Sequence, residues 1–159
     1  GVLTTVIDSG PRFDTTEPIR LTVVTPKLEA LQASGGAEID AEVGRTKRFS
    51  ADASGGAEIR VTDLQTDAAA VEASGGADVT LAGSAKTLSA DASGGAEIHA
   101  FKLQATQLNV DASGGAEIEG RATDEVSGDI SGGATLYLKS PPQVQKLRTS
   151  GGGQVRFDG

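Results

Sequence analysis

Apolar and polar residues alternate with a period of two along most of the chain from Leu28 onward. In residues 49–62, for example, apolar side chains take every second position on both sides of a Ser-Gly-Gly triplet. Alternation of this kind is typical of β-strands with one buried and one solvated face. A helix would need apolar residues three and four positions apart, and a glycine pair in its interior would cost about 2 kcal/mol. The pattern therefore predicts strands and no helix.

The predicted strands belong to one repeated unit. The heptapeptide Ala-Ser-Gly-Gly-Ala-Glu-Ile, called here the repeat word, occurs four times unchanged and once as Ala73–Val79, which reads Ala-Ser-Gly-Gly-Ala-Asp-Val. Two more divergent copies lie at Ile130–Leu136 and Thr149–Val155. Successive copies are 18 to 20 residues apart, a period that indicates a solenoid. The serines of the seven copies are Ser34, Ser54, Ser74, Ser93, Ser113, Ser131 and Ser150.

Equivalent positions of the repeat form columns of similar residues. Five residues after each serine, every copy has Ile, Val or Leu; three residues after it, every copy has Ala except the last, which has Gly153. Such columns are expected when equivalent residues stack in strands about 4.8 Å apart. The glycine pair would form a bend within each coil, because glycine accepts a positive φ without a Cβ clash. We therefore predict an all-β fold, a single-stranded and right-handed parallel β-helix (β-solenoid) of about seven rungs of 18–20 residues.

The length of the chain fits one domain, and the repeat array is expected to fill residues 28–159 of it. Residues 1–27 lack the repeat word but contain two alternating stretches separated by turn signals. We expect irregular N-terminal strands or a cap in this segment, which is followed by the array.

Composition narrows the partners that this solenoid could have. A formal net charge of -8 makes nucleic acid and anionic membrane surfaces poor partners. The chain has no cysteine, which excludes disulfides and thiolate metal sites. No apolar run is long enough for a transmembrane helix, so direct membrane insertion is not expected. The chain begins with glycine and without a signal peptide, as a mature or trimmed chain would, and this start carries no weight against secretion.

The repeat and its flanking residues resemble a known family. Val23–Leu28 precedes the array, and a closing pattern is present at Gly132–Tyr137, at Pro141–Pro142 and at Ser150–Gly152. From about residue 19 to the end, the chain is similar to the GIN-domain family, the head domains of bacterial auto-transporter adhesins. The resemblance implies a parallel β-helix, a place in the bacterial cell envelope or outside the cell, and no established enzymatic activity. The chain departs from the family in having Ser-Gly-Gly where Gly-Ser-Gly is usual, and in short or missing upstream strands.

Acidic residues predominate at two outward positions of the repeat: the residue two before the serine and the residue four after it are each acidic in five of the seven copies. Stacked carboxylates about 5 Å apart could supply the several oxygen ligands that Ca²⁺ prefers, and no other cofactor is expected. The alternative, which we expect to hold, is that the acids only keep the rod soluble and prevent sideways growth of the sheet. The candidate Ca²⁺ ligands are Asp52, Glu72, Asp91, Asp111, Glu58, Asp78, Glu97 and Glu117.

The only histidine, His99, lies in a third outward column, six residues after the serine. A catalytic triad would need it beside a nucleophilic serine, but the serines belong to the repeat and no nucleophile elbow is present. We therefore expect His99 to be an exposed surface residue, and we predict no catalytic residues.

These observations favour a non-enzymatic, structural or adhesin-like β-helix of the bacterial cell envelope or surface, periplasmic or extracellular. It would present an acidic repeat face to a glycan or a protein. One alternative is end-to-end self-assembly into a filament or dimer through open β-helix ends. Another is an enzyme such as a polysaccharide lyase or hydrolase, which would need a cleft built by long loops, whereas the turns here are short.

Overall fold

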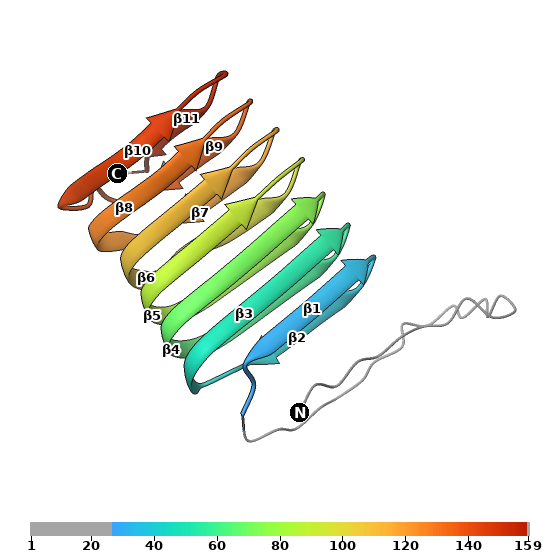
Figure 1. The fold of residues 1–159 in the computed structure, drawn as a ribbon. Helices are drawn as coiled ribbons and strands as arrows, with labels where there is room; N and C mark the ends of the chain where they lie inside the picture. Colours follow the sequence, from blue (N-terminus) through green and yellow to red (C-terminus); the bar gives the residue numbers. More distant parts are fainter. Residues whose placement is uncertain (1–26, 159) are drawn as a thin grey trace, which may run out of the picture.

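The structure is a computed structural model and describes Lys27–Asp158, so the predicted N-terminal strands or cap lie outside the described residues except for Lys27. The described part is all-β without a helix, and one parallel sheet winds into a β-solenoid of about six turns (Figure 1). Seven copies of the repeat word enclose six complete coils, which accounts for the difference from the seven rungs predicted. The strands are β1 (Ala30–Gly35), β2 (Glu38–Glu42), β3 (Arg45–Gly55), β4 (Glu58–Gly75), β5 (Asp78–Ala92), β6 (Glu97–Ala112), β7 (Glu117–Gly120), β8 (Ala122–Ile130), β9 (Thr135–Leu138), β10 (Val144–Thr149) and β11 (Gln154–Phe157).

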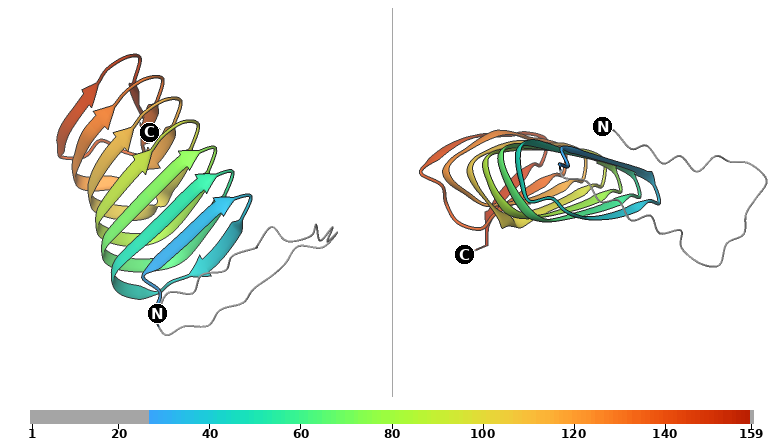
Figure 2. Two further views of the ribbon diagram at one scale, coloured as in Figure 1. Left: turned by 45° about the vertical axis from the view of Figure 1, so that its right-hand side comes forward. Right: turned by 90° about the horizontal axis from the view of Figure 1, so that it is seen from below.

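Each coil is flattened, and its two long sides meet at the Ser-Gly-Gly turn (Figure 2). Parallel pairing keeps equivalent residues of successive coils side by side: Ser54 pairs with Ser34 and with Ser74, and Ile59 pairs with Ile39. The register shifts only in the variable half of the coil, as between Val61 and Leu64 where β4 pairs with β5. The predicted columns are therefore confirmed.

The core is a stack of the inward columns. The Ile, Val or Leu that follows each serine by five residues is fully buried in all five inner copies of the word, and the Ala between it and the glycine pair is buried with it. In the first and last copies, Ile39 and Val155 are only half-buried and Ala37 is exposed. Each of these copies has a neighbouring coil on only one side within the described residues, which explains its greater exposure.

The first glycine of each pair makes the turn possible. From Gly35 to Gly132, this glycine has a φ between 67° and 75°, in the left-handed region that residues with a Cβ rarely adopt. Stacking adds a second requirement, because a Cβ on Gly114 would lie 2.9 Å from the carbonyl oxygen of Gly94 in the preceding coil. The turn therefore places the residues on its two sides at fixed positions in every coil.

Candidate functional site

The eight carboxylates predicted as Ca²⁺ ligands form two separate ladders, one on each side of the Ser-Gly-Gly turn. The ladder before the turn, called here the groove ladder, has five acids in register: Asp52, Glu72, Asp91, Asp111 and Asp129. The ladder after the turn, called the turn ladder, also has five: Glu38, Glu58, Asp78, Glu97 and Glu117. Because the two ladders lie on opposite sides of the turn, the eight candidates do not form one site. Ca²⁺ binding, the less favoured of the two interpretations, stays open for each ladder separately.

The groove ladder borders a shallow, open groove. The groove is lined by acids, by the alanines next to them and by repeat serines, with no lysine or arginine in the lining. Within residues 27–158, none of the five acids of the groove ladder takes part in an ion pair, and Asp52 accepts a hydrogen bond from Gln32 (3.3 Å). Partial burial, followed by the charges of Asp111 and Glu72, raises the pKa of Asp91 above the ordinary value of an aspartate. The groove therefore carries negative charge that the described chain does not neutralise.

The turn ladder is different because a second outward column runs beside it. This column, six residues after each serine, is in register from β2 to β11. It mixes acids, bases and neutral residues, in contrast to the groove ladder. Its members are Asp40, Arg60, Thr80, His99, Glu119, Tyr137 and Arg156.

Arg60 of this column neutralises the acids around it. Its guanidinium donates to the carboxylate of Glu58 on the same strand, and to that of Asp40 in the preceding coil at 3.2 Å. The charges of Glu58 and Asp40 raise the pKa of Arg60, so the group stays charged at every working pH. This group of three residues, the Arg60 cluster, is a closed surface ion-pair network.

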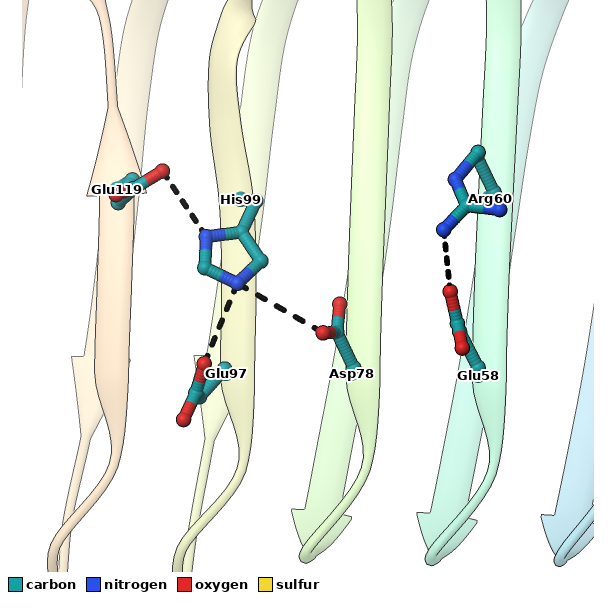
Figure 3. A network of polar contacts seen from close by, with 6 residues as sticks. All are labelled: Glu58, Arg60, Asp78, Glu97, His99 and Glu119. Atoms are coloured by element: carbon teal, nitrogen blue, oxygen red, sulfur yellow. Dashed lines mark hydrogen bonds and ion pairs between the residues drawn. The ribbon is translucent and has the colours of Figure 1, made fainter.

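His99 lies at the equivalent position two coils further on, among three carboxylates (Figure 3). Its Nε2 atom is 3.3 Å from Oε2 of Glu97 and 3.8 Å from Oδ2 of Asp78. On the other side of the ring, Nδ1 is 3.0 Å from Oε2 of Glu119 in the next coil. The imidazole is 31% exposed, so this group of four residues, the His99 cluster, is accessible to solvent and to dissolved ions.

Two opposing effects act on the pKa of His99. Burial is the largest single influence and lowers it, since a charged imidazolium loses hydration. The hydrogen bond to Glu119 and the charges of Asp78, Glu119 and Glu97 act the other way, and together they raise the pKa above the ordinary value. The cluster therefore favours positive charge at the position of the imidazole ring.

The same cluster contains the residues best placed to hold a metal ion. One ligand atom from each of Asp78, Glu97 and His99 can be chosen so that all lie within 4.8 Å of one another, the only such group of three among the described residues. The Oδ1 atom of Asp78 is buried and has no hydrogen-bond partner. Asp78 and Glu97 were among the predicted ligands, whereas His99 was expected to be a plain surface residue. The sequence did contain a signal for this cluster. Glu119 lies one repeat, 20 residues, after His99, so a third acid could be expected beside the imidazole in addition to Asp78 and Glu97.

Comparisons with known proteins identify relatives of this fold. A family model described as "Putative auto-transporter adhesin, head GIN domain" matches residues 4–142. A crystal structure of a putative adhesin from Bacteroides fragilis is similar, with a TM-score of 0.77 at 21% sequence identity. The similarity covers 84% of the present chain, which spans only 62% of that protein. No curated protein matches the chain. In the described residues, no helix is long and apolar enough to cross a membrane.

Proposed function

Because the chain belongs to the family of auto-transporter adhesin head GIN domains, we propose that it is a non-catalytic adhesive module displayed at the bacterial cell surface. Its adhesive surface is the groove bordered by the groove ladder. The structural neighbour from Bacteroides fragilis, described as a putative adhesin, supports the solenoid fold of such a module. In this proposal, the module adheres by binding an external partner through this acidic groove.

One observation carries this proposal: the groove ladder has five stacked carboxylates and no cationic partner among the described residues. Carboxylates on neighbouring strands repel one another, and the raised pKa of Asp91 reflects burial first and this repulsion second. A ladder made only to keep the rod soluble could mix acids, bases and neutral residues, as the outward column beside the turn ladder does. A partner that brings positive charge into the groove would relieve the repulsion.

The groove fits a basic protein segment better than a glycan. Its lining contains no aromatic side chain on which a sugar ring could stack. Its carboxylates repeat at about 4.8 Å, close to the 5–6 Å between side chains three or four residues apart on a helix. A helix with lysines or arginines along one face would place its charges near successive rungs.

Binding of an oligolysine peptide, followed by biolayer interferometry at several salt concentrations, tests the groove. The variant Asp52→Asn/Glu72→Gln/Asp91→Asn/Asp111→Asn should weaken binding by at least about tenfold, because it removes the charges that the groove presents. The matched control removes four exposed or half-buried acids elsewhere, Glu38→Gln/Glu42→Gln/Glu117→Gln/Asp124→Asn, and has the same net charge.

The control decides between a specific surface and general attraction. If both variants lose binding equally, only the overall charge of the chain matters and the groove is not the adhesive surface. Retention of full oligolysine binding by the groove variant would contradict the proposal as well. Binding of a neutral polysaccharide that is unchanged in the groove variant would place adhesion on a different surface.

A further inference from the structure

Two residues that occur once among the closely matching copies of the repeat lie close together on the solenoid. Asp78 belongs to the one closely matching copy of the word that has Asp-Val in place of Glu-Ile, and His99 is the only histidine in the chain. Asp78 lies on β5 and His99 on β6, and the two side chains meet across the strand pair. The changed acid of the turn ladder and the single histidine of the chain therefore lie side by side.

The hydrogen bond to Glu119 determines how the imidazole is oriented. A carboxylate can only accept, so Nδ1 must carry the hydrogen in the 3.0 Å contact with Glu119. In the neutral ring, Nε2 then presents a lone pair toward Glu97 and Asp78, at 3.3 and 3.8 Å. Two carboxylates and a nitrogen lone pair converge without a donor among them. In the neutral ring this arrangement favours a positive charge at its centre, which either a proton on Nε2 or a bound cation supplies.

A second observation also points to a ligand. The Oδ1 atom of Asp78 is buried and makes no hydrogen bond, although its other oxygen faces His99. A buried carboxylate oxygen without a partner carries a desolvation cost. The side chain of Asp78 as a whole is 43% exposed, so a cation at the centre of the cluster could reach this carboxylate through Oδ2, the oxygen that faces His99.

We propose that Asp78, Glu97 and His99 bind a divalent transition-metal ion of the zinc class. The ligands are one oxygen from each carboxylate and Nε2 of the imidazole, and Glu119 is a positioning residue that holds the ring through Nδ1. Borderline metals of this class accept imidazole nitrogen, whereas Ca²⁺ and Mg²⁺ take oxygen ligands. A carboxylate bonded to the far nitrogen of a ligand histidine is a common outer partner in zinc sites.

The three ligand atoms lie within 4.8 Å of one another, so the side chains would have to draw closer together around such an ion. Ligand atoms about 2.0–2.2 Å from a tetrahedral zinc ion lie roughly 3.4 Å from one another. The contact between His99 and Glu97 already has this length, and Asp78 would move closer to Nε2 by about 0.4 Å, a shift that a half-buried side chain can make. Three protein ligands leave one position for water or for a group from a partner. The site lies on the turn ladder, so it is independent of the proposed adhesive groove.

Calorimetric titration of the untagged chain with zinc chloride tests this proposal. We expect one site per chain, and a loss of affinity of at least about tenfold in His99→Gln and in Asp78→Asn, each of which removes a ligand. Glu119→Gln should weaken binding by about tenfold although it removes no ligand, because second-sphere partners of this kind contribute 10- to 100-fold. Glu38→Gln removes an acid from the same ladder away from the cluster and should leave the affinity within about twofold of the original value.

Cobalt(II) provides a second measurement that a purely structural role would not affect. Its visible absorption bands should appear at one equivalent in the wild type and in Glu38→Gln, and should be absent in His99→Gln. Circular dichroism would establish that each variant is folded. The proposal is overturned if zinc produces no heat with the folded wild type, or if His99→Gln binds zinc and cobalt as well as the wild type does.

Discussion

The Arg60 cluster and the His99 cluster are centred on the same column of the solenoid, but they differ in how far the negative charge of their carboxylates is neutralised (Figure 3). At Arg60, one permanently charged guanidinium pairs with two carboxylates, that of Asp40 in the preceding coil and that of Glu58 on its own strand. At His99, one imidazole faces three carboxylates from three successive coils. The backbone is equivalent at the two places, so the difference lies entirely in the side chains.

The next coil supplies the decisive residue. His99 pairs in register with Glu119, which accepts from Nδ1, whereas Arg60 pairs with Thr80, which has no charge. The two clusters thus differ at three successive positions of one column, which reads Asp-Arg-Thr around Arg60 and Thr-His-Glu around His99. In a solenoid, the outward columns can change in this way without a change in the core, because inward and outward residues alternate along each strand.

The largest expected effect comes from β5, the strand between those of Arg60 and His99, which carries Asp78 and Thr80. Gly83 of β5 has a φ of 139°, and a Cβ there would lie 2.0 Å from the carbonyl oxygen of Leu64. Gly83→Ala should therefore lower the free energy of unfolding by at least about 3 kcal/mol and displace Asp78 from His99. Urea unfolding measures the loss. Gly36→Ala, whose Cβ would meet nothing within 4 Å, is the control, and an equal cost for the two variants would refute the role of Gly83.

A transplanted site should show the next largest effect. In a His99→Gln background, Arg60→His/Thr80→Glu places an imidazole beside Glu58 and gives it an orienting carboxylate in the next coil. We expect this chain to bind zinc at least about tenfold more tightly than Arg60→His alone in the same background. Calorimetry measures both affinities. Equal binding by the two chains would mean that the acid in the next coil does not distinguish the clusters.

The reverse exchange should abolish the metal site at little cost to the fold. His99→Arg replaces a nitrogen lone pair with a guanidinium that only donates, so zinc binding should be lost. Without metal, and at a pH well above the pKa of the imidazole, the permanent charge among three acids should stabilise the chain by up to about 1 kcal/mol. Thermal unfolding of the wild type, His99→Arg and His99→Gln measures this gain. If His99→Arg were less stable than the wild type, a positive charge at this position would not be favourable.

The smallest effect concerns the groove ladder, which lacks any base. The pKa of Asp91 is raised in the folded state, so ionisation of this group opposes folding. The penalty is absent below the ordinary aspartate pKa of 3.8, develops as the pH rises through the raised pKa, and is complete above it. Asp91→Asn should therefore stabilise the chain at pH 7 by a few tenths of a kcal/mol, after allowance for solvent screening, and should lose this advantage near pH 3. Urea titrations at the two pH values check the sign, and an Asn variant less stable at pH 7 would contradict it.

The sequence predicts most of the fold because the repeat determines it. The alternation of residues, the columns and the positive φ of the first glycine in each turn all follow from local rules, and the structure confirms them in Ile59 and Gly55 as in their equivalents. The exposed ends were not anticipated residue by residue. Ala37 belongs to a core column but is exposed, because burial depends on a neighbouring coil as well as on the residue itself.

The candidate site was predicted only in part, for a physical reason. Asp78 and Glu97 were found because acids recur at a fixed position, but the same rule placed them in one list with Asp52 and Asp91, which lie across the turn. For His99 the sequence argues only against a catalytic triad, because the serines belong to the repeat and no nucleophile elbow is present. Its role depends on which side chains stand beside it in two neighbouring coils, and this requires the register of the whole array.

The most direct measurement of the central claim, that the His99 cluster is a cation site on an otherwise regular solenoid, uses the single histidine itself. Nitrogen-15 NMR of the histidine-labelled chain observes only His99. We predict that, in the neutral ring, Nδ1 carries the proton and that one equivalent of zinc shifts the Nε2 resonance while Nδ1 stays protonated. A neutral ring with its proton on Nε2, or an Nε2 resonance that excess zinc does not shift, would contradict the account.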